Sequence, residues 1–300
     1  MDLGSLLNFA GGIGLFLLGM RLMSDGLKVA AGPALRGLLA TATRSSWRGV
    51  GSGVLITSLV QSSSAVIFAT IGFVNAGLLN LGQAVWVIFG ANVGTTLTSW
   101  IVALVGFNID LQALAMPAIA AGMGLWILGK GRRSALGQAL VGFGIFFLGL
   151  DVLKDSFAGL GDTFEIDGWV RDGAVGIAVF ALVGAVLTVL MQSSSATLAV
   201  TLTAAAGGVL PLTAAAAMVI GAKVGTTSTA LFAVFGATPA AKRAAASHVA
   251  FNLVTALVAL PALPWILAGS QWLADALGFA SQPATILAVF HTMTAWWAWC

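Results

Sequence analysis

The feature that most constrains this fold is a five-residue phrase, Gln-Ser-Ser-Ser-Ala, which occurs at residues 61–65 and again at 192–196. Each copy lies inside a strongly apolar stretch. Amides and hydroxyls left unpaired in an apolar medium cost about 4–8 kcal/mol each on the harshest transfer scale. They must therefore bond to one another, to backbone that a helix has released, or to a bound solute. One copy could be polar contact between membrane helices; two copies in matching places favour a functional site.

Composition gives the class of protein that surrounds these phrases. Hydrophobic residues make up 59% of the chain and charged residues only 8%, whereas soluble domains carry about 25% charged residues. The sequence therefore predicts an all-α integral membrane protein with several spans in a lipid bilayer. The net charge of +3 does not indicate nucleic-acid binding, because the basic residues lie in short loops between apolar segments. A lone cysteine, Cys300, and two separate histidines predict no disulfide and no metal centre.

The chain also repeats itself over longer distances. The pattern Gly-x-Gly-x-Phe-x-Leu-Gly at 12–19 returns at 142–149, and the serine phrases follow 131 residues apart. The stretch Gly-Ala-Asn-Val-Gly-Thr-Thr at 90–96 returns as Gly-Ala-Lys-Val-Gly-Thr-Thr at 221–227. Three anchors in one order indicate an internal duplication, with a first repeat at residues 1–134 and a second at 135–300.

Apolar segment lengths predict which parts cross the bilayer, since a spanning helix needs about 20 residues. The two arms around each serine phrase are shorter than that, so we expect each pair to form a re-entrant helical hairpin. We expect residues 90–96 and 221–227 to break their spans, and Pro33 to open a short surface helix. The predicted hairpins cover 50–79 and 174–208, and the predicted full spans cover 9–27, 82–105, 111–129, 138–153, 211–236, 245–268 and 284–300.

Loop charges predict the orientation, because basic residues favour the cytoplasmic side. With the N-terminus outside, the inner loops hold nine basic residues, and the outer loops hold eight acidic residues against two basic ones. Three full spans lie between matching points of the two repeats, so the second repeat is inverted relative to the first. Seven full spans from an external N-terminus place Cys300 in the cytoplasm. Inverted repeats with interrupted helices are typical of secondary transporters, whose site lies near the midplane. The inner residues are Lys28, Arg36, Arg44, Arg48, Lys130, Arg132, Arg133, Lys242 and Arg243; the outer acidic ones are Asp110, Asp151, Asp155, Asp162, Glu165, Asp167, Asp172 and Asp275.

The residue types predict what such a site binds. Helix N-termini offer N–H donors to an anion. Freed carbonyls and the hydroxyls of Ser and Thr suit a hard cation such as Na⁺. Apart from Lys223 the predicted site is nearly uncharged, which favours a solute that enters with its own counter-ions. The alternative for the Gly-x-x-Gly-Thr-Thr segments is a notch for close helix packing.

Two Gln-Ser-Ser-Ser phrases, each followed by a Gly-Ala-Asn-x-Gly-Thr-Thr-like segment, resemble the type II sodium-dependent phosphate cotransporters and their bacterial relatives. The resemblance covers nearly the whole chain. It implies sodium-coupled symport of inorganic phosphate by alternating access, with sodium as the coupling ion, no other cofactor and no enzymatic activity. The family's His-x-x-Phe-Asn pattern stands at 248–252, but His291 is followed by a different sequence. Many bacterial relatives continue into a cytoplasmic regulator-like domain, which we do not expect in this chain.

Carried over by position, the resemblance implies a set of residues that bind phosphate and sodium. Sodium is expected among six of them, namely Gln61, Ser64, Thr95, Gln192, Ser195 and Thr226. The full set is Gln61, Ser62, Ser63, Ser64, Asn92, Thr95, Thr96, Gln192, Ser193, Ser194, Ser195, Lys223, Thr226 and Thr227.

Several readings stay open at this point. The substrate could be another oxyanion, such as arsenate or sulfate, or the chain could be a membrane sensor that does not transport. A homodimer is open too, and the expected location is the cell (inner) membrane. Lys223 either takes the place of one sodium, contacts phosphate, or pairs with a distant residue such as Asp25. We interpret Arg21 and Asp25 as an ordinary i,i+4 pair, and His248 as a hydrogen-bonded histidine at the start of a span.

Overall fold

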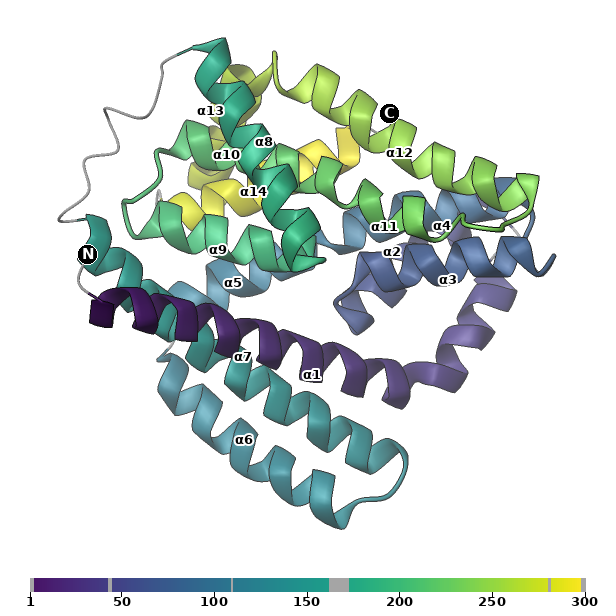
Figure 1. The fold of residues 1–300 in the computed structure, drawn as a ribbon, viewed down its shortest axis with the longest axis horizontal. Helices are drawn as coiled ribbons and strands as arrows, with labels where there is room; N and C mark the ends of the chain where they lie inside the picture. Colours follow the sequence, from purple (N-terminus) through teal and green to yellow (C-terminus); the bar gives the residue numbers. More distant parts are fainter. Residues whose placement is uncertain (1–2, 43–44, 109, 162–172, 280–281, 298–300) are drawn as a thin grey trace.

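The computed structural model describes residues 3–42, 45–108, 110–161, 173–279 and 282–297 (Figure 1). Over these residues the protein is all-helical, in agreement with the sequence. Cys300, Arg44, Arg171 and the acidic loop residues Asp162, Glu165, Asp167 and Asp172 lie outside the described part. The described helices are α1 (Leu3–Ala42), α2 (Ser46–Val60), α3 (Ser63–Asn75), α4 (Leu81–Gly94), α5 (Thr96–Asn108), α6 (Leu111–Leu128), α7 (Arg132–Gly161), α8 (Ala174–Met191), α9 (Ser194–Ala206), α10 (Leu212–Gly225), α11 (Thr227–Phe232), α12 (Pro239–Ala259), α13 (Leu263–Ala276) and α14 (Pro283–Trp297).

The chain is an integral membrane protein by the length and composition of these helices. In the described part, six stretches are long and apolar enough to cross a bilayer, or seven if the bent pair α12–α13 counts as one span. The helices α3 and α9 are apolar but too short, as expected for hairpin arms. The helix α8 passes the length test with 18 residues, although the sequence analysis assigns it to a hairpin. The inverted membrane orientation of the two repeats stays a prediction.

Local sequence signals account for several of the described helix starts. Asn80 and Gln83 form a reciprocal capping box at α4, and the Asp110 side chain accepts hydrogen bonds from two backbone N–H groups at α6. Thr238 caps α12, whose first residue is Pro239. Such caps satisfy backbone donors that a helix start otherwise leaves free. They place the loops between the apolar segments where the sequence predicts them.

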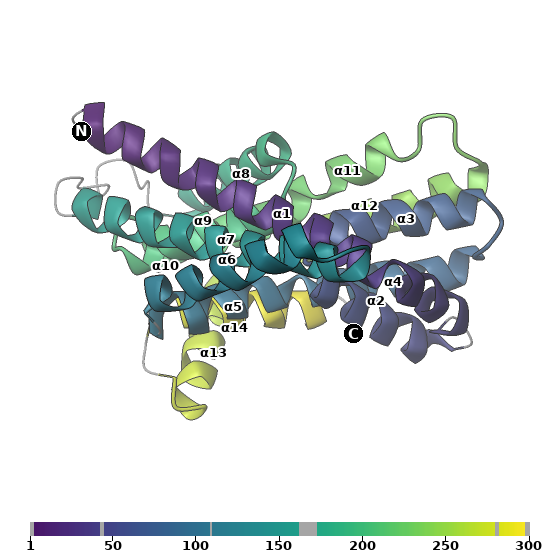
Figure 2. The same ribbon diagram turned by 90° about the horizontal axis from the view of Figure 1, so that it is seen from below.

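Two expected boundaries are wrong. The helix α1 continues through Pro33 to Ala42, so Pro33 does not open a separate surface helix; a proline in a long helix costs one backbone hydrogen bond but need not end it. The span expected at 245–268 is instead two helices, α12 and α13, that meet at 87°. Pro261 lies in the short connection and Pro264 in the first turn of α13, and residues before a proline disfavour helix. Figure 2 shows α13 projecting away from the body of the molecule.

The glycine-rich segments also differ from expectation. We expect breaks at 90–96 and 221–227 that free backbone groups, yet the interruption is one residue in each case, Thr95 and Thr226. Both keep right-handed helical dihedrals, φ/ψ of −64°/−23° and −61°/−22°. Residues 81–107 and 212–232 each therefore run on as one span. The glycines serve the alternative purpose, which is close packing.

This packing is the same in both repeats. Gly90 of α4 lies against the carbonyl oxygen of Val50 in α2, and Gly221 of α10 lies against that of Ala181 in α8. A Cβ built at Gly94 or Gly225 would stand 2.7 Å from the Cβ of Thr57 or Thr188, respectively. Because all these partners are 131 residues apart, the duplication is present in the packing as well as in the sequence.

The repeats meet along α1 and α7, which run antiparallel side by side (Figures 1 and 2). Gly19 lies against the backbone of Phe146, and Gly149 against that of Phe16, so the contact is reciprocal. At one end Gly12 faces Val152 and Leu153, and at the other Gly26 faces Ala135 and Ala139. These contacts involve residues of the repeated Gly-x-Gly-x-Phe-x-Leu-Gly pattern and their neighbours. The pattern therefore recurs because it forms the interface between α1 and α7.

Each hairpin packs on elements of the opposite repeat. The second arm of the first hairpin, α3, lies beside α12, where the backbone N–H of Thr238 donates to Asn75 Oδ1 at 2.8 Å (Figure 1). The second arm of the other hairpin, α9, packs on α5 of the first repeat and also on α7 of its own repeat. The predicted boundary at residues 134/135 falls in the first turn of α7, and the two predicted segments share their cores. The hairpin tips are thereby brought to the centre of the molecule.

Candidate functional site

The two repeated glutamines hold an unusual backbone conformation. In the described part of the chain, Gln61 and Gln192 are the non-glycine residues with positive φ, at 55° and 52°. Such a left-handed residue costs about 1–3 kcal/mol when it is not glycine, and glycine is the usual choice after a helix. Each side chain donates from Nε2 to the carbonyl three residues earlier, of Ser58 and Val189. A strained residue at the same place in both repeats points to a function for its side chain or for the turn.

The turn brings two helix ends together at each phrase. Ser62 caps the N-terminus of α3 and accepts from Ala65 N at 3.3 Å; Ser193 caps α9 and accepts from Ala196 N at 3.2 Å. The preceding helices, α2 and α8, end directly before Gln61 and Gln192, respectively. A helix N-terminus carries partial positive charge and a C-terminus partial negative charge. At each phrase, the N-terminus of the following helix can therefore stabilise an anion, and the C-terminus of the preceding helix can stabilise a cation.

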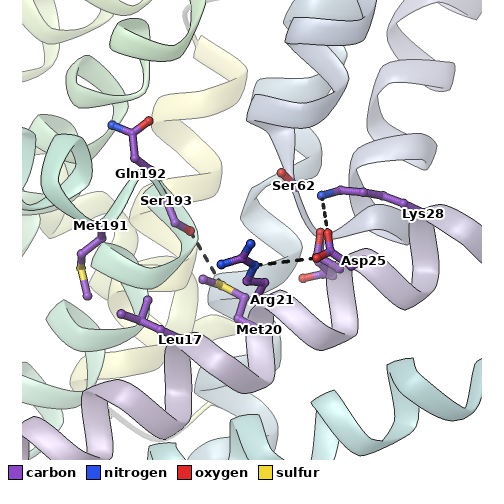
Figure 3. A pocket seen from close by; sticks show the side chains of 11 residues that line it. Leu17, Met20, Arg21, Asp25, Lys28, Ser62, Met191, Gln192 and Ser193 are labelled. Carbon is purple, nitrogen blue, oxygen red and sulfur yellow. Dashed lines mark hydrogen bonds and ion pairs between the residues drawn. The ribbon is translucent and has the colours of Figure 1, made fainter. Parts of the chain in front are cut away.

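Both serine phrases line one pocket. It has a volume of about 400 Å³ and is lined by Gln61 and Ser62 from the first phrase and by Gln192 and Ser193 from the second. The helix α1 forms another wall, and Met20 on it accepts a weak hydrogen bond from the Ser193 hydroxyl at 3.8 Å (Figure 3). A thioether is a poor acceptor, so this hydroxyl is available to a better partner. The remaining lining residues are Leu17, Arg21, Ser24, Asp25, Lys28 and Met191.

The structure thus gathers four predicted site residues at one cavity, and the other predicted residues do not line it. Ser63, Ser194 and Ser195 are buried in the first turns of α3 and α9, and Ser64 is half-buried. Asn92, Thr95, Thr96 and Thr226 are buried, and Thr227 is half-buried. The predicted site is therefore divided between a pocket wall and a set of buried or half-buried polar residues, here called the buried layer, that do not line the pocket.

Thr98 joins the two repeats within that layer, and the sequence analysis missed it. Its hydroxyl donates to Gln61 Oε1 at 3.0 Å and lies 3.4 Å from the hydroxyl of Ser195. A small cavity of about 10 Å³ adjoins Gln61 and Thr98, about the space of one water. A signal was present, because the repeated segment extends to Gly-Thr-Thr-x-Thr at 94–98 and 225–229.

Several buried hydroxyls leave their oxygens free to accept. Thr95 donates to Ala91 O at 3.0 Å, and Thr226 donates to Ala222 O at 2.9 Å, in the equivalent geometry. A hydroxyl that donates to its own helix still offers lone pairs to another partner. Asn92 likewise donates its amide to Ile88 O at 3.0 Å. Oxygens presented in this way suit a hard cation.

Lys223 occupies in α10 the position that Asn92 occupies in α4. It is 6% exposed, and its Nζ has no hydrogen-bond partner or ion pair among the described residues. Asp25, the distant partner considered from the sequence, is paired with Arg21 and Lys28 instead. A buried unpaired ammonium is costly, so this site calls for an anion or an exchange of protons.

The two histidines are buried in separate places. His248 lies in the middle of α12, so its expected position at a helix start is wrong; Asn252 Nδ2 lies 3.2 Å from its Nδ1. His291 on α14 is bonded to the Ser99 hydroxyl at 2.8 Å. Trp100 Nε1 donates to Thr292 at 3.0 Å beside it. These two bonds tie α5, which carries Thr98, to α14.

Comparison with known proteins agrees with this architecture. YqeW of Bacillus subtilis (strain 168) is 29% identical over 295 residues, covering 96% of this chain and 90% of that protein. The "Putative inorganic phosphate export protein YjbB" of Escherichia coli (strain K12) is 28% identical over 290 residues, 96% of this chain but 51% of its own length. The chain thus spans about half the length of that relative.

A shorter match reaches animal proteins. "Sodium-dependent phosphate transport protein 2A" of Oryctolagus cuniculus is 45% identical over 56 residues, 19% of this chain and 9% of that protein. No solved structure matches the chain. The model of the Na⁺/Pi-cotransporter family matches residues 15–155 and 176–279, which include both serine phrases, both glycine-rich segments and the α1–α7 contact. The chain belongs to the Na⁺/Pi-cotransporter family.

Proposed function

We propose that this protein carries inorganic phosphate across the cell membrane in symport with sodium, by alternating access around the pocket between the two serine phrases. The observation that carries the proposal is the pair of left-handed glutamines, Gln61 and Gln192, whose turns meet at one cavity of about 400 Å³. The cavity holds helix N-termini, amides and hydroxyls, which are the groups that bind an oxyanion. Family membership supports phosphate and sodium as its ligands.

The buried layer supports a role for sodium. The Thr98 hydroxyl lies within hydrogen-bond distance of both Gln61 Oε1 and Ser195 Oγ, so three side-chain oxygens from both repeats gather there. In our proposal one sodium ion binds here and draws the two hairpin tips together, so that phosphate completes the site only when sodium is present. Thr95 and Thr226 supply further oxygens of the same kind.

The test is phosphate uptake into proteoliposomes containing the full chain, with and without an inward sodium gradient. We expect sodium-driven uptake of phosphate. Uptake that follows another oxyanion alone would contradict the substrate, and phosphate binding without flux would indicate a sensor. Phosphate flux that ignores sodium would contradict the coupling.

A matched pair of variants connects this test to the site. Thr98→Val keeps the shape of the side chain but removes the hydroxyl between Gln61 and Ser195, and we expect sodium-driven uptake to fall at least tenfold. Thr229→Val is the control, because Thr229 stands at the equivalent place and its hydroxyl bonds only to Thr226 O of its own helix. Equal loss in both variants, or no loss in Thr98→Val, would exclude the proposed role of this layer.

Net phosphate export is a second candidate, favoured by the printed name of YjbB, which matches 96% of this chain. The same pocket can serve either direction, because the ion gradient and the coupling decide the net flux. Vesicles loaded with phosphate distinguish the two: efflux without an imposed sodium gradient supports export. Efflux that requires an outward sodium gradient supports a symporter that can run in reverse.

A further inference from the structure

The wall that α1 contributes to the pocket is the charged one. Arg21, Ser24, Asp25 and Lys28 all line it, and their spacing of three or four residues places them on one face of the helix. Two positive groups and one negative group leave this wall with a net charge of +1. From the sequence, Arg21 and Asp25 are expected to form an ordinary i,i+4 pair, but such a pair has no reason to border the serine phrases.

Asp25 lies between the two cations on this wall of the pocket. Its Oδ1 accepts from Lys28 Nζ at 3.1 Å, and its Oδ2 lies 3.9 Å from Arg21 Nε (Figure 3). The second distance exceeds hydrogen-bond length, so the Arg21 guanidinium does not make the paired, parallel bonds that this group forms with a carboxylate or a phosphate. Its side chain is 84% exposed. Arg21 is therefore held near the pocket by charge while its donors are left free.

A second, independent observation points to a missing ligand. Ser24 is 7% exposed, and its Oγ has no hydrogen-bond partner within the described residues, although it borders the same cavity one turn from Arg21 and Lys28. A buried hydroxyl without a partner loses its hydrogen bonds to water and gains none in the protein, which costs free energy. An anion in the pocket would accept from this hydroxyl and from the guanidinium together.

We propose that Asp25 is a built-in competitor of the transported oxyanion: it holds Arg21 and Lys28 while the pocket is empty, and phosphate displaces it from Arg21. This inference rests on the proposed function and deepens it, because it names the residue that binds the anion and the residue that limits its affinity. Arg21 is the binding group, since its planar fork matches two phosphate oxygens. Asp25 sets the phosphate affinity low enough for release.

The test is binding of inorganic phosphate to the purified full chain in lipid nanodiscs, measured by calorimetry at fixed sodium. Asp25→Asn removes the competitor and should tighten phosphate binding two- to fivefold, the size expected for a partly exposed ion pair. Arg21→Gln should weaken it at least tenfold, and Arg21→Lys, which keeps the charge but loses the fork, should lie between. In the Arg21→Gln background, Asp25→Asn should lose most of its effect.

Exposed residues of α7 supply the matched controls. Asp155 stands 130 residues after Asp25, on α7, and is exposed outside the pocket lining; Arg133 is exposed at the start of α7. Asp155→Asn and Arg133→Gln make the same charge changes and should leave the phosphate affinity unchanged. Equal effects of variants and controls, unchanged binding in Arg21→Gln, or weaker binding in Asp25→Asn would overturn the proposal. A parent protein that binds no phosphate would overturn the proposed function as well.

Discussion

Gln61 and Gln192 hold a conformation that suits glycine, and this is informative about the site. A glutamine in the left-handed region keeps strain that a glycine would relieve. The two residues nevertheless differ in surroundings, because Gln61 is buried and bonded to Thr98 whereas Gln192 is exposed. The pair therefore has the same backbone conformation but different side-chain contacts, so the two copies of the phrase can have different roles.

Gln192 gives a direct test of this strain. Gln192→Gly and Gln192→Ala both remove the side chain, but only glycine relieves the left-handed backbone. We expect both variants to lose most phosphate uptake, and the glycine variant to be more stable than the alanine variant by about 1 kcal/mol. Thermal unfolding in detergent measures the difference. If the alanine variant is equally stable, the turn is not strained; if either transports normally, the glutamine is not part of the site.

Lys223 breaks the repeat symmetry in another way. Its ammonium is buried without a partner at the position of Asn92. A fixed charge there can take the place of one sodium ion, so we expect Lys223→Asn to make phosphate uptake more steeply dependent on sodium. The measurement is the Hill slope of uptake against sodium in proteoliposomes. An unchanged slope together with an unchanged phosphate affinity would show that the charge has no part in coupling.

Among the elements, the paired helices α2–α4 and α8–α10 form the rigid supports of the hairpins. Gly90 and Gly221 allow the backbones to touch, since each lies directly against a carbonyl oxygen of the partner helix. Close backbone approach at small residues is a main source of helix association in lipid, where the hydrophobic effect does not act between helices. The position of each hairpin tip therefore depends on these two glycines.

We expect Gly90→Ala and Gly221→Ala each to lower stability by about 1–3 kcal/mol, the usual cost of overpacking. Both should also reduce phosphate uptake, because the added methyl group pushes α4 from α2 or α10 from α8. The control is Gly124→Ala in α6, where a Cβ meets no atom within 4 Å and alanine favours the helix by up to about 1 kcal/mol. Unfolding in detergent, with uptake on the same samples, checks this; no difference between the three variants would rule out the packing role.

At the scale of the whole molecule, the two repeats are interlocked by the reciprocal α1–α7 contact and by hairpins that pack on the opposite repeat. This arrangement fits the proposed alternating access, in which one set of elements moves against the other around a shared pocket. The number of crossings is the quantity on which the orientation depends. It depends on whether α8 crosses the bilayer or turns back with α9 as a hairpin, and on whether the bent pair α12–α13 crosses once.

Labelling of Cys300 tests the number of crossings, because Cys300 is the only thiol in the sequence. The predicted seven full spans, with the bent pair α12–α13 counted as one, and two re-entrant hairpins place it in the cytoplasm when the N-terminus is external. We expect an impermeant maleimide to label it in inside-out vesicles and not in intact cells. If α8 crosses as a span of its own, the count changes by one and labelling occurs in intact cells instead, which would overturn the predicted topology.

The sequence by itself determined the class of protein, the helical elements, the duplication and the two serine phrases, because hydropathy, helix caps and repeated residues act within a few turns of chain. It also contained, unused, the prolines that bend α12 against α13. Only the tertiary structure showed that Thr98 lies between Gln61 and Ser195, which are 37 residues before it and 97 residues after it. It likewise showed that α1 brings Arg21, Ser24, Asp25 and Lys28 to the pocket. Which side chains share a cavity depends on how helices far apart in the chain pack together, and the local patterns that define each helix do not specify its partner.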